Sequence, residues 1–167
     1  MIILLNGLSG SGKSAIAQEL LKNNPDEYNI VQSYTTRQRR SPDDNDHTFI
    51  SKRKLIRKML SQNFIARTEI DGNIYCAFDY QFKKDKVNIY IVDDFGIIDV
   101  INFHPNDSLY IIRVKGQHQS VDEDRKNRFE HIIHDDCQFI DLILENSEEI
   151  TISELASEIE DFVKEKK

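Results

Sequence analysis

A short apolar run followed by a glycine-rich loop constrains this chain more than any other stretch. Residues 2–14 read Ile-Ile-Leu-Leu-Asn-Gly-Leu-Ser-Gly-Ser-Gly-Lys-Ser. Residues 7–14 fit G-x-x-x-x-G-K-[ST], the P-loop pattern, in which backbone N–H groups surround phosphate groups. This chemistry needs a buried strand before the loop and a helix that begins at Lys13, because the N-terminal N–H groups and dipole of that helix face the phosphates. The plainer interpretation is a glycine-rich turn between a strand and a helix, and the flanking pattern favours the phosphate site.

The residue types in the loop match what phosphate binding requires. Glycines permit backbone angles and a close approach that a side chain would block. Lys13 is placed to reach the β- and γ-phosphates, and the Ser14 hydroxyl to hold Mg²⁺. The candidate cofactor-binding residues are therefore Gly7, Ser9, Gly10, Ser11, Gly12, Lys13 and Ser14.

Composition narrows the class of protein and its partners. With 167 residues and 39% apolar side chains, the chain can form one domain with a sizeable core. The net charge of −7 argues against a nucleic-acid polymer as partner. No stretch is long enough to cross a membrane, and residues 1–5 are too short for a signal-peptide core. Together with only two cysteines, these features predict a cytoplasmic protein that does not use a membrane.

Hydrophobic periodicity and capping residues predict the order of helices and strands. Helices are expected over 13–23, after Ser51, over 95–103, from Ser120 to about His134, and after Thr151. In the helix after Ser51, the side chains of Leu55, Ile56, Met59 and Leu60 form an apolar stripe. Strands are expected over 29–33, 64–70, 74–78, 87–92, 108–114 and 139–144, and residues 35–46 are expected to be irregular.

This alternation predicts an α/β fold, because strands that alternate with helices form a parallel sheet covered on both faces. Residues from about 34 to 80 interrupt the alternation with a helix and a hairpin. We therefore expect one domain over residues 1–167, with residues 34–80 as an inserted subdomain that binds the acceptor substrate.

A second polar cluster follows the second strand and reads Ser33-Tyr34-Thr35-Thr36-Arg37-Gln38-Arg39-Arg40. Arg37 and Arg40 can clamp a phosphate dianion from two sides, since each guanidinium offers paired donors. A solvated basic loop is the alternative interpretation.

With these motifs the sequence resembles the guanylate kinases. The resemblance rests on the P-loop, Ser33-x-Thr35-Thr36-Arg37-x-x-Arg40, Asp46-His47-x-Phe49-Ile50-Ser51, Phe64-Ile65 leading to Gly72-Asn73-Ile74-Tyr75, and Asp93-x-x-Gly96. It implies a P-loop NTPase fold of three layers with an acceptor-binding subdomain. It also implies a kinase that transfers the γ-phosphoryl of ATP, with Mg²⁺, onto a nucleoside monophosphate.

The resemblance also implies roles for particular residues. Ser33, Arg37, Arg40 and Tyr75 would bind the acceptor monophosphate, and His47 stands where the family has a tyrosine on that phosphate. Asp93 would lie at the end of the strand beside the P-loop strand and orient Mg²⁺ through water; a simple helix cap is the alternative.

Two departures from the family pattern affect base recognition. The family reads guanine with a carboxylate nine residues before the tyrosine and a hydroxyl two residues after it, and these positions here are Ala66 and Ala77. Thr68 shares the strand face of Ala66 and is the natural substitute, whereas Glu69 needs a bulge to reach that face.

A third departure concerns the lid, which is shortened here to residues 115–119 before the next predicted helix. Arg125 and Arg128 share one face of that helix and, with Arg113, can supply positive charge around the migrating phosphoryl group. A surface salt-bridge pattern is the alternative. His131 and His134 share a helical face but match no zinc signature, so we predict no metal site there.

The predicted function is therefore phosphotransfer from MgATP, with Lys13, Asp93, Arg125 and Arg128 as catalytic residues. The first-choice acceptor is GMP or dGMP, in a monomer or homodimer that acts on small-molecule nucleotides. A different acceptor remains open, another nucleotide or a ribose bisphosphate, which one relative of the family phosphorylates. A non-catalytic binding module also remains open, although such modules have degraded P-loops and this one is intact.

Overall fold

The computed structural model describes residues 1–105, 107–116 and 139–167. Its elements in chain order are β1 (Ile2–Asn6), α1 (Lys13–Asn23), β2 (Tyr28–Val31), β3 (Tyr34–Thr35), β4 (Thr48–Phe49), α2 (Lys52–Ser61), β5 (Phe64–Ile70), β6 (Asn73–Phe78), the short 3-10 helix η1 (Asp79–Gln81), β7 (Val87–Ile91), α3 (Asp94–Phe103), β8 (Leu109–Gly116), β9 (Leu142–Asn146) and α5 (Ile152–Glu165). The helix predicted between Ser120 and His134 lies outside the described residues.

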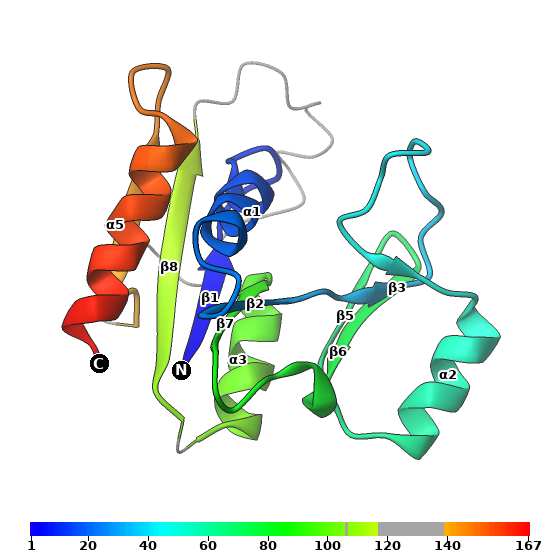
Figure 1. The fold of residues 1–167 in the computed structure, drawn as a ribbon. Coiled ribbons are helices and arrows are strands. Elements are labelled where there is room, and N and C mark those ends of the chain that lie inside the picture. The colour runs from blue at the N-terminus through cyan, green and yellow to red at the C-terminus, as the bar shows by residue number, and fades with distance from the viewer. Residues whose placement is uncertain (106, 117–138) are drawn as a thin grey trace.

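The central sheet confirms the α/β prediction. Its five strands are all parallel and follow the order β2-β7-β1-β8-β9. Helices α1 and α5 cover one face, and α3 covers the other (Figure 1). Because parallel strands end at the same edge, the loops that follow β1 and β7 meet at the carboxyl edge of the sheet.

Alternate side chains along the central strands supply two separate cores. Ile3, Leu5 and Ile89 point toward α1 and α5, where they pack with Leu20 and Ile159. The intervening residues point toward α3 and pack with its Ile97 and Val100. This two-sided burial explains why the central strands read as continuous apolar runs rather than as alternating ones.

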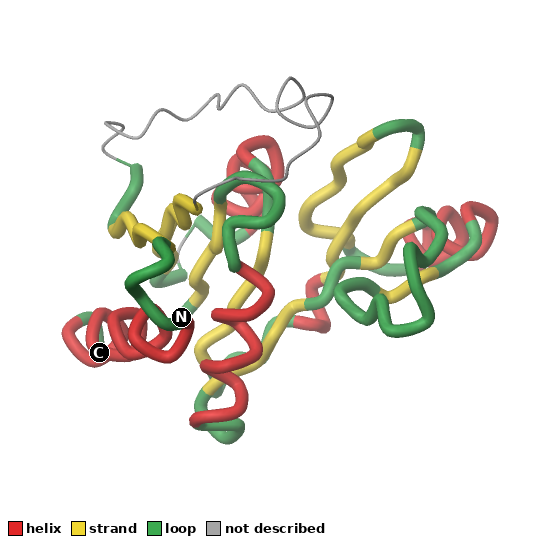
Figure 2. The backbone as a smooth tube through the Cα atoms, turned by 90° about the horizontal axis from the view of Figure 1, so that it is seen from above, coloured by secondary structure: helices red, strands yellow, loops and turns green. Residues whose placement is uncertain are grey.

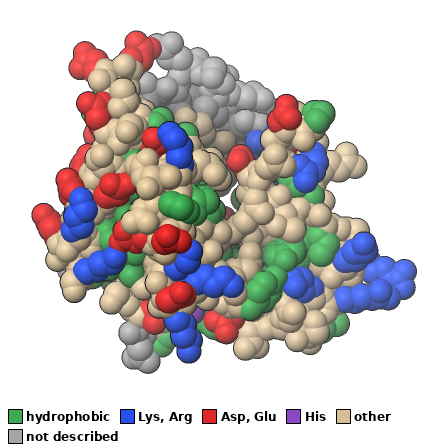
Figure 3. Space-filling model, in the orientation of Figure 1, with side chains coloured by type: hydrophobic (Ala, Val, Ile, Leu, Met, Phe, Trp, Pro, Cys, Tyr) green, Lys and Arg blue, Asp and Glu red, His purple; other side chains and the backbone are tan. Residues whose placement is uncertain are grey.

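A second, smaller sheet lies to one side of the central sheet, in the order β4-β3-β6-β5 (Figures 1 and 2). The predicted hairpin of β5 and β6 is confirmed, and its turn contains Asp71 and Gly72 with positive φ angles. One face of the hairpin packs on Leu55 of α2, and the other face packs on α3. The space-filling view shows the surface hollowed between the parts of the molecule formed by the two sheets (Figure 3).

Several expected boundaries and contacts differ in the structure. The last strand begins at Leu142 instead of 139, because Asp141 turns its carboxylate to the backbone N–H of Ile111 at 2.8 Å. The second strand is Tyr28–Val31, and Thr35, which was expected in the irregular stretch, is paired in β3 (Tyr34–Thr35). The apolar stripe of α2 is only partly buried, since Leu60 is 84% exposed. Ser51 precedes α2, but its side chain makes no capping hydrogen bond.

The predicted capping box of the last helix is confirmed. The Thr151 hydroxyl accepts from the Glu154 backbone N–H, while the Glu154 carboxylate accepts from the Thr151 N–H. No helix among the described residues is long and apolar enough to span a membrane.

Candidate active site

The P-loop joins β1 to α1 with the backbone that its sequence requires. Gly7 has a φ of 140°, and a Cβ there would lie 2.2 Å from the carbonyl oxygen of Val114. Gly12 has a φ of 98° and directly precedes the first residue of α1, Lys13. Glycine is needed at both positions, at Gly7 for space and at Gly12 for conformation. The start of α1 at Lys13 confirms the predicted strand–loop–helix arrangement.

The Lys13 side chain folds back over the loop. Its ammonium group donates to the carbonyl oxygens of Gly7 at 2.8 Å and Leu8 at 2.6 Å, and to the Ser11 hydroxyl at 3.1 Å. Burial lowers the pKa of Lys13 to about 8. A positive charge held among backbone dipoles at a helix N-terminus is what a polyphosphate would bind.

The ends of β8 and β9 pack against the P-loop. The side-chain amide of Asn146, the last residue of β9, donates to the Ser11 carbonyl oxygen at 2.9 Å. Gly116 at the end of β8 lies so close that a Cβ there would be 2.8 Å from the Ser11 Cα. Sequence reasoning did not identify Asn146. The sequence feature that could have indicated this residue is an asparagine at the carboxyl end of a predicted strand.

Asp93 lies just beyond β7, which pairs directly with β1. This pairing brings Asp93 to the same edge of the sheet as the P-loop. Its carboxylate accepts from the backbone N–H of Gly96 at 2.8 Å, as the N-cap of α3, and the Thr68 side chain lies near it. Burial is the main cause that raises the pKa of Asp93. The capping contact that was the alternative for Asp93 is thus present, and a carboxylate bound in this way can still hold water.

Arg113 of β8 stands opposite Asn6, the last residue of β1. It is buried, and its Nη2 lies 3.7 Å from an oxygen of Asp94 in the first turn of α3. This guanidinium is therefore fixed at the carboxyl edge of the sheet, under the start of α3. Arg125, Arg128, His131 and His134 lie outside the described residues. Among the residues described, no three His, Cys, Asp or Glu side chains gather as a metal site.

The loop between β3 and β4 brings three of the predicted acceptor residues together. The Arg37 guanidinium lies near Tyr75 and over the ring of Phe49, at 5.2 Å from the ring centroid. The His47 ring packs edge-on against Tyr75 with 5.3 Å between centroids. These contacts make a compact cluster of a guanidinium, an imidazole and a phenol.

Two buried polar atoms of this cluster lack a hydrogen-bond partner among the described residues. They are Nε of Arg37 and Nδ1 of His47. Burial, followed by the charge of Arg37, lowers the pKa of His47, so its imidazole is neutral at pH 7. A buried donor without a partner is costly unless a ligand satisfies it. The Nε–H of Arg37 is such a donor and suits an anion, and a neutral His47 can also donate from Nδ1 in the tautomer that carries its proton there.

The other predicted acceptor residues lie differently. The Ser33 hydroxyl is buried and donates to the Tyr90 hydroxyl at 3.2 Å. Arg40 is exposed, and its backbone N–H donates to Asp44. Thr68 pairs with Tyr75 across the hairpin, and its side chain lies near Asp93.

The two alanines at the base-reading positions are buried in the core. Ala66 is 2% exposed and Ala77 is fully buried, both packed in the apolar cluster that includes Ile97 of α3. The pairing of β5 with β6 is irregular between Phe64 and Arg67, and the Arg67 N–H donates to Asp99 of α3 at 3.2 Å. This bulge lies before Glu69, which faces away and forms an ion pair with Arg67 at 3.0 Å.

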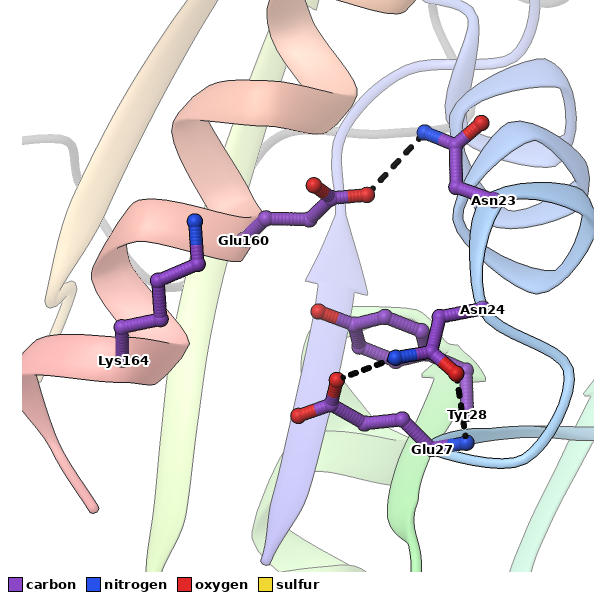
Figure 4. A pocket seen from close by; sticks show the side chains of 6 residues that line it. All are labelled: Asn23, Asn24, Glu27, Tyr28, Glu160 and Lys164. Atoms are coloured by element: carbon purple, nitrogen blue, oxygen red, sulfur yellow. Dashed lines mark hydrogen bonds between the residues drawn. The ribbon is translucent and has the colours of Figure 1, made fainter.

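A polar cavity lies at the other end of α1, away from the P-loop (Figure 4). Its lining residues are Asn23, Asn24, Glu27, Tyr28, Glu160 and Lys164. The Asn23 amide donates to Glu160 of α5 at 3.0 Å and the Asn24 amide to Glu27 at 2.8 Å. These bonds fix the end of α1 against α5 and the start of β2.

A parallel sheet with a P-loop between its first strand and first helix defines the P-loop NTPase fold. The guanylate kinase family model matches residues 1–91, more than half of the chain, so the chain belongs to the guanylate kinase family. It is 32% identical over 75 residues to guanylate kinase of Sus scrofa, covering 44% of this chain and 38% of that protein. It is 40% identical over 77 residues to guanylate kinase of Bartonella henselae, covering 44% of this chain and 33% of that protein.

The alignments with these curated relatives therefore span well under half of their length. The fold likeness extends further. The structure of guanylate kinase from Anaplasma phagocytophilum matches with a TM-score of 0.71 at 20% identity, covering 99% of this chain and 85% of that one. At this identity the match concerns the fold. The assignment to the family thus rests on residues 1–91, and the assignment of the fold rests on nearly the whole chain.

Proposed function

We propose that this protein is a nucleoside monophosphate kinase that transfers the γ-phosphoryl group of MgATP to a phosphate-bearing acceptor, with GMP or dGMP as first choice. The observation that carries the proposal is the pairing of two anion sites in one fold. The first is the P-loop with Lys13, and the second is the cluster of Arg37, His47 and Tyr75, in which two buried nitrogen atoms have no hydrogen-bond partner among the described residues. Membership of the guanylate kinase family supports this pairing of donor and acceptor sites.

On the donor side, the loop amides and the Lys13 ammonium would hold the phosphates of ATP. Lys13 would exchange the carbonyl oxygens of Gly7 and Leu8 for phosphate oxygens. Ser14 and Asp93 would hold Mg²⁺, since hydroxyl and carboxylate oxygens are ligands that this ion prefers and Asp93 can act through water. The bound Mg²⁺ would neutralise charge on the β- and γ-phosphates.

On the acceptor side, Arg37, Tyr75 and the His47 imidazole would hold the acceptor phosphate, with Ser33, Arg40 and Thr68 nearby. Catalysis would consist of positioning the two phosphates and neutralising charge, without a covalent enzyme intermediate. Arg113, Arg125 and Arg128 would add positive charge around the migrating group. A cytoplasmic location and a monomeric or homodimeric state stay predictions.

A second acceptor class is favoured by one specific observation. The positions that read guanine in the family are alanines packed under α3, where they offer no hydrogen bond. Another nucleotide or a ribose bisphosphate would keep the same phosphate contacts while using a different base or sugar site. Thr68, two residues after Ala66 on β5, and Asp93 beside it are then candidate polar groups for that site.

The test is to identify the products. The protein is incubated with MgATP and GMP, and the nucleotides are separated by ion-exchange chromatography. We expect ADP and GDP in equal amounts. ADP with free phosphate and no phosphorylated acceptor, for GMP and for every alternative tried, would contradict phosphotransfer.

A further inference from the structure

Asp44 joins the two arginine positions of the acceptor site, although nothing in the sequence motif marks it. Its side chain is only 8% exposed, and one carboxylate oxygen lies 2.9 Å from Nη1 of Arg37. The same oxygen accepts from the backbone N–H of Arg40 at 2.9 Å, while the other lies 3.5 Å from Nη2 of Arg37. One carboxylate thus fixes a guanidinium and the backbone of the loop that follows it.

The contacts of Arg37 show which part of its guanidinium is already used. Nη1 donates to the carbonyl oxygen of Gln38 at 2.9 Å as well as to Asp44. Nε is buried and has no hydrogen-bond partner in the part of the chain that the structure describes. Asp44 therefore occupies the Nη edge of the guanidinium and leaves Nε–H for a different acceptor.

We propose that Asp44 is the positioning residue of the acceptor phosphate site. It holds Arg37 so that Nε–H, with the buried imidazole of His47, is directed to the phosphate of the acceptor. The same carboxylate accepts from the Arg40 backbone N–H, so it fixes the conformation of the loop that carries both arginines. This inference rests on the proposed function and adds to it the residue that orients its acceptor site.

The charge of Asp44 suits this role. Hydrogen bonds from Arg37, followed by the one from the Arg40 backbone, lower the pKa of Asp44 to about 2, so the carboxylate is ionised at any working pH. A charged hydrogen bond to a planar guanidinium is short and directional, and it removes rotamer freedom that phosphate binding would otherwise have to remove.

A competing role predicts the opposite sign. If the acceptor phosphate used the Nη edge itself, it would have to displace Asp44, and the carboxylate would act as an internal competitor. Removing the charge would then tighten acceptor binding. The direction of the change in acceptor KM therefore separates positioning from competition.

The test uses Asp44→Asn, with Asp43→Asn as the matched control, because Asp43 is the exposed neighbour in the same loop. We expect Asp44→Asn to raise the KM for GMP about tenfold, with kcat within about twofold and the KM for ATP unchanged. Asp44→Glu should restore part of the loss. A lower acceptor KM, an equal effect of Asp43→Asn, or a loss of kcat and ATP binding in parallel would overturn the proposal.

A second readout does not depend on turnover. Thermal unfolding is followed with GMP alone and with inorganic phosphate alone, and we expect both to raise the Tm of the wild type more than that of Asp44→Asn. If these anions stabilise the wild type but it transfers no phosphoryl group, the proposed kinase function is contradicted, and the positioning role of Asp44 is not. A wild type that neither anion stabilises would overturn this proposal as well.

Discussion

In the P-loop, the cation that would meet a phosphate is surrounded by oxygens of its own loop, and Lys13 makes three such contacts. In the loop between β3 and β4, by contrast, Arg37 is anchored by a carboxylate while its Nε and the nearby His47 Nδ1 lack partners among the described residues. The first site can satisfy itself without ligand, and the second cannot. We infer that donor binding depends on one contiguous motif, whereas the proposed acceptor site combines residues of the loop between β3 and β4 with Tyr75 of β6.

The largest effect is expected at the donor site. Lys13→Ala should lower kcat by about 10³-fold or more, because one fixed positive charge on the transferring phosphates is lost. Its Tm should not fall, since the desolvated ammonium is also removed. Steady-state rates and thermal unfolding measured on the same preparation check both statements. A Lys13→Ala protein with full activity would contradict the mechanism.

Placing the family's guanine-reading carboxylate at position 66 should destabilise the fold. Ala66 is packed against α3, so Ala66→Glu would bury a charge and lower the free energy of unfolding by about 3 kcal/mol. Urea denaturation provides the measurement, with Thr68→Glu on the same strand as a less buried control. An Ala66→Glu protein that is as stable as the wild type and gains affinity for GMP would contradict this burial and would mean that position 66 faces the base site.

Substitutions in the acceptor cluster should have a smaller effect, confined to the KM of the acceptor. Arg37 and Arg39 both lie over the Phe49 ring, at 5.2 and 4.5 Å, but only Arg37 also contacts Tyr75 and has an unpartnered Nε among the described residues. Arg37→Met should raise the acceptor KM about 30-fold, the equivalent of about 2 kcal/mol. Arg39→Met, the matched control, should change it by less than about threefold. Equal effects of the two variants would mean that general charge, and not the Arg37 geometry, binds the acceptor.

The smallest effect concerns pH. Burial holds the pKa of Lys13 at about 8 in the ligand-free protein, and phosphates would raise it. Below pH 8 the ammonium is already charged, so the Kd for MgATP should stay level. Above pH 8 binding must take up a proton, and the Kd should rise by up to about tenfold per pH unit. Isothermal titration at several pH values measures this, and Lys13→Arg, charged throughout, should show a flat profile.

Local signals in the sequence were sufficient for several elements of the central sheet and of the inserted subdomain. The P-loop, the start of α1 at Lys13, the hairpin and the Thr151 capping box each depend on residues a few positions apart, and the structure confirms them. The family resemblance is confirmed as well. The start of β9 was wrong because Asp141 is held by Ile111, a residue thirty positions away, and no local pattern reports that contact.

Contacts across the chain explain what the sequence did not predict in the candidate site. Asn146 reaches Ser11 only because β9 lies beside β8 at the same sheet edge. The burial of Ala66 depends on where β5 bulges and on how closely α3 approaches it. Asp44 lies only seven positions after Arg37 but belongs to no motif, and its proposed role follows from the fold of the loop that brings it back to Arg37. The roles of the predicted site residues stay predictions until they are measured.

The measurement that tests the central claim most directly is coupled ADP release with MgATP and a panel of acceptors. The panel contains GMP, dGMP, the other nucleoside monophosphates, ribose 1,5-bisphosphate and, as the matched control, guanosine. The account predicts that at least one phosphate-bearing acceptor, GMP or dGMP first, stimulates ADP release and that guanosine does not. Stimulation by guanosine equal to that by GMP, or no stimulation by any acceptor while MgATP is bound, would contradict it.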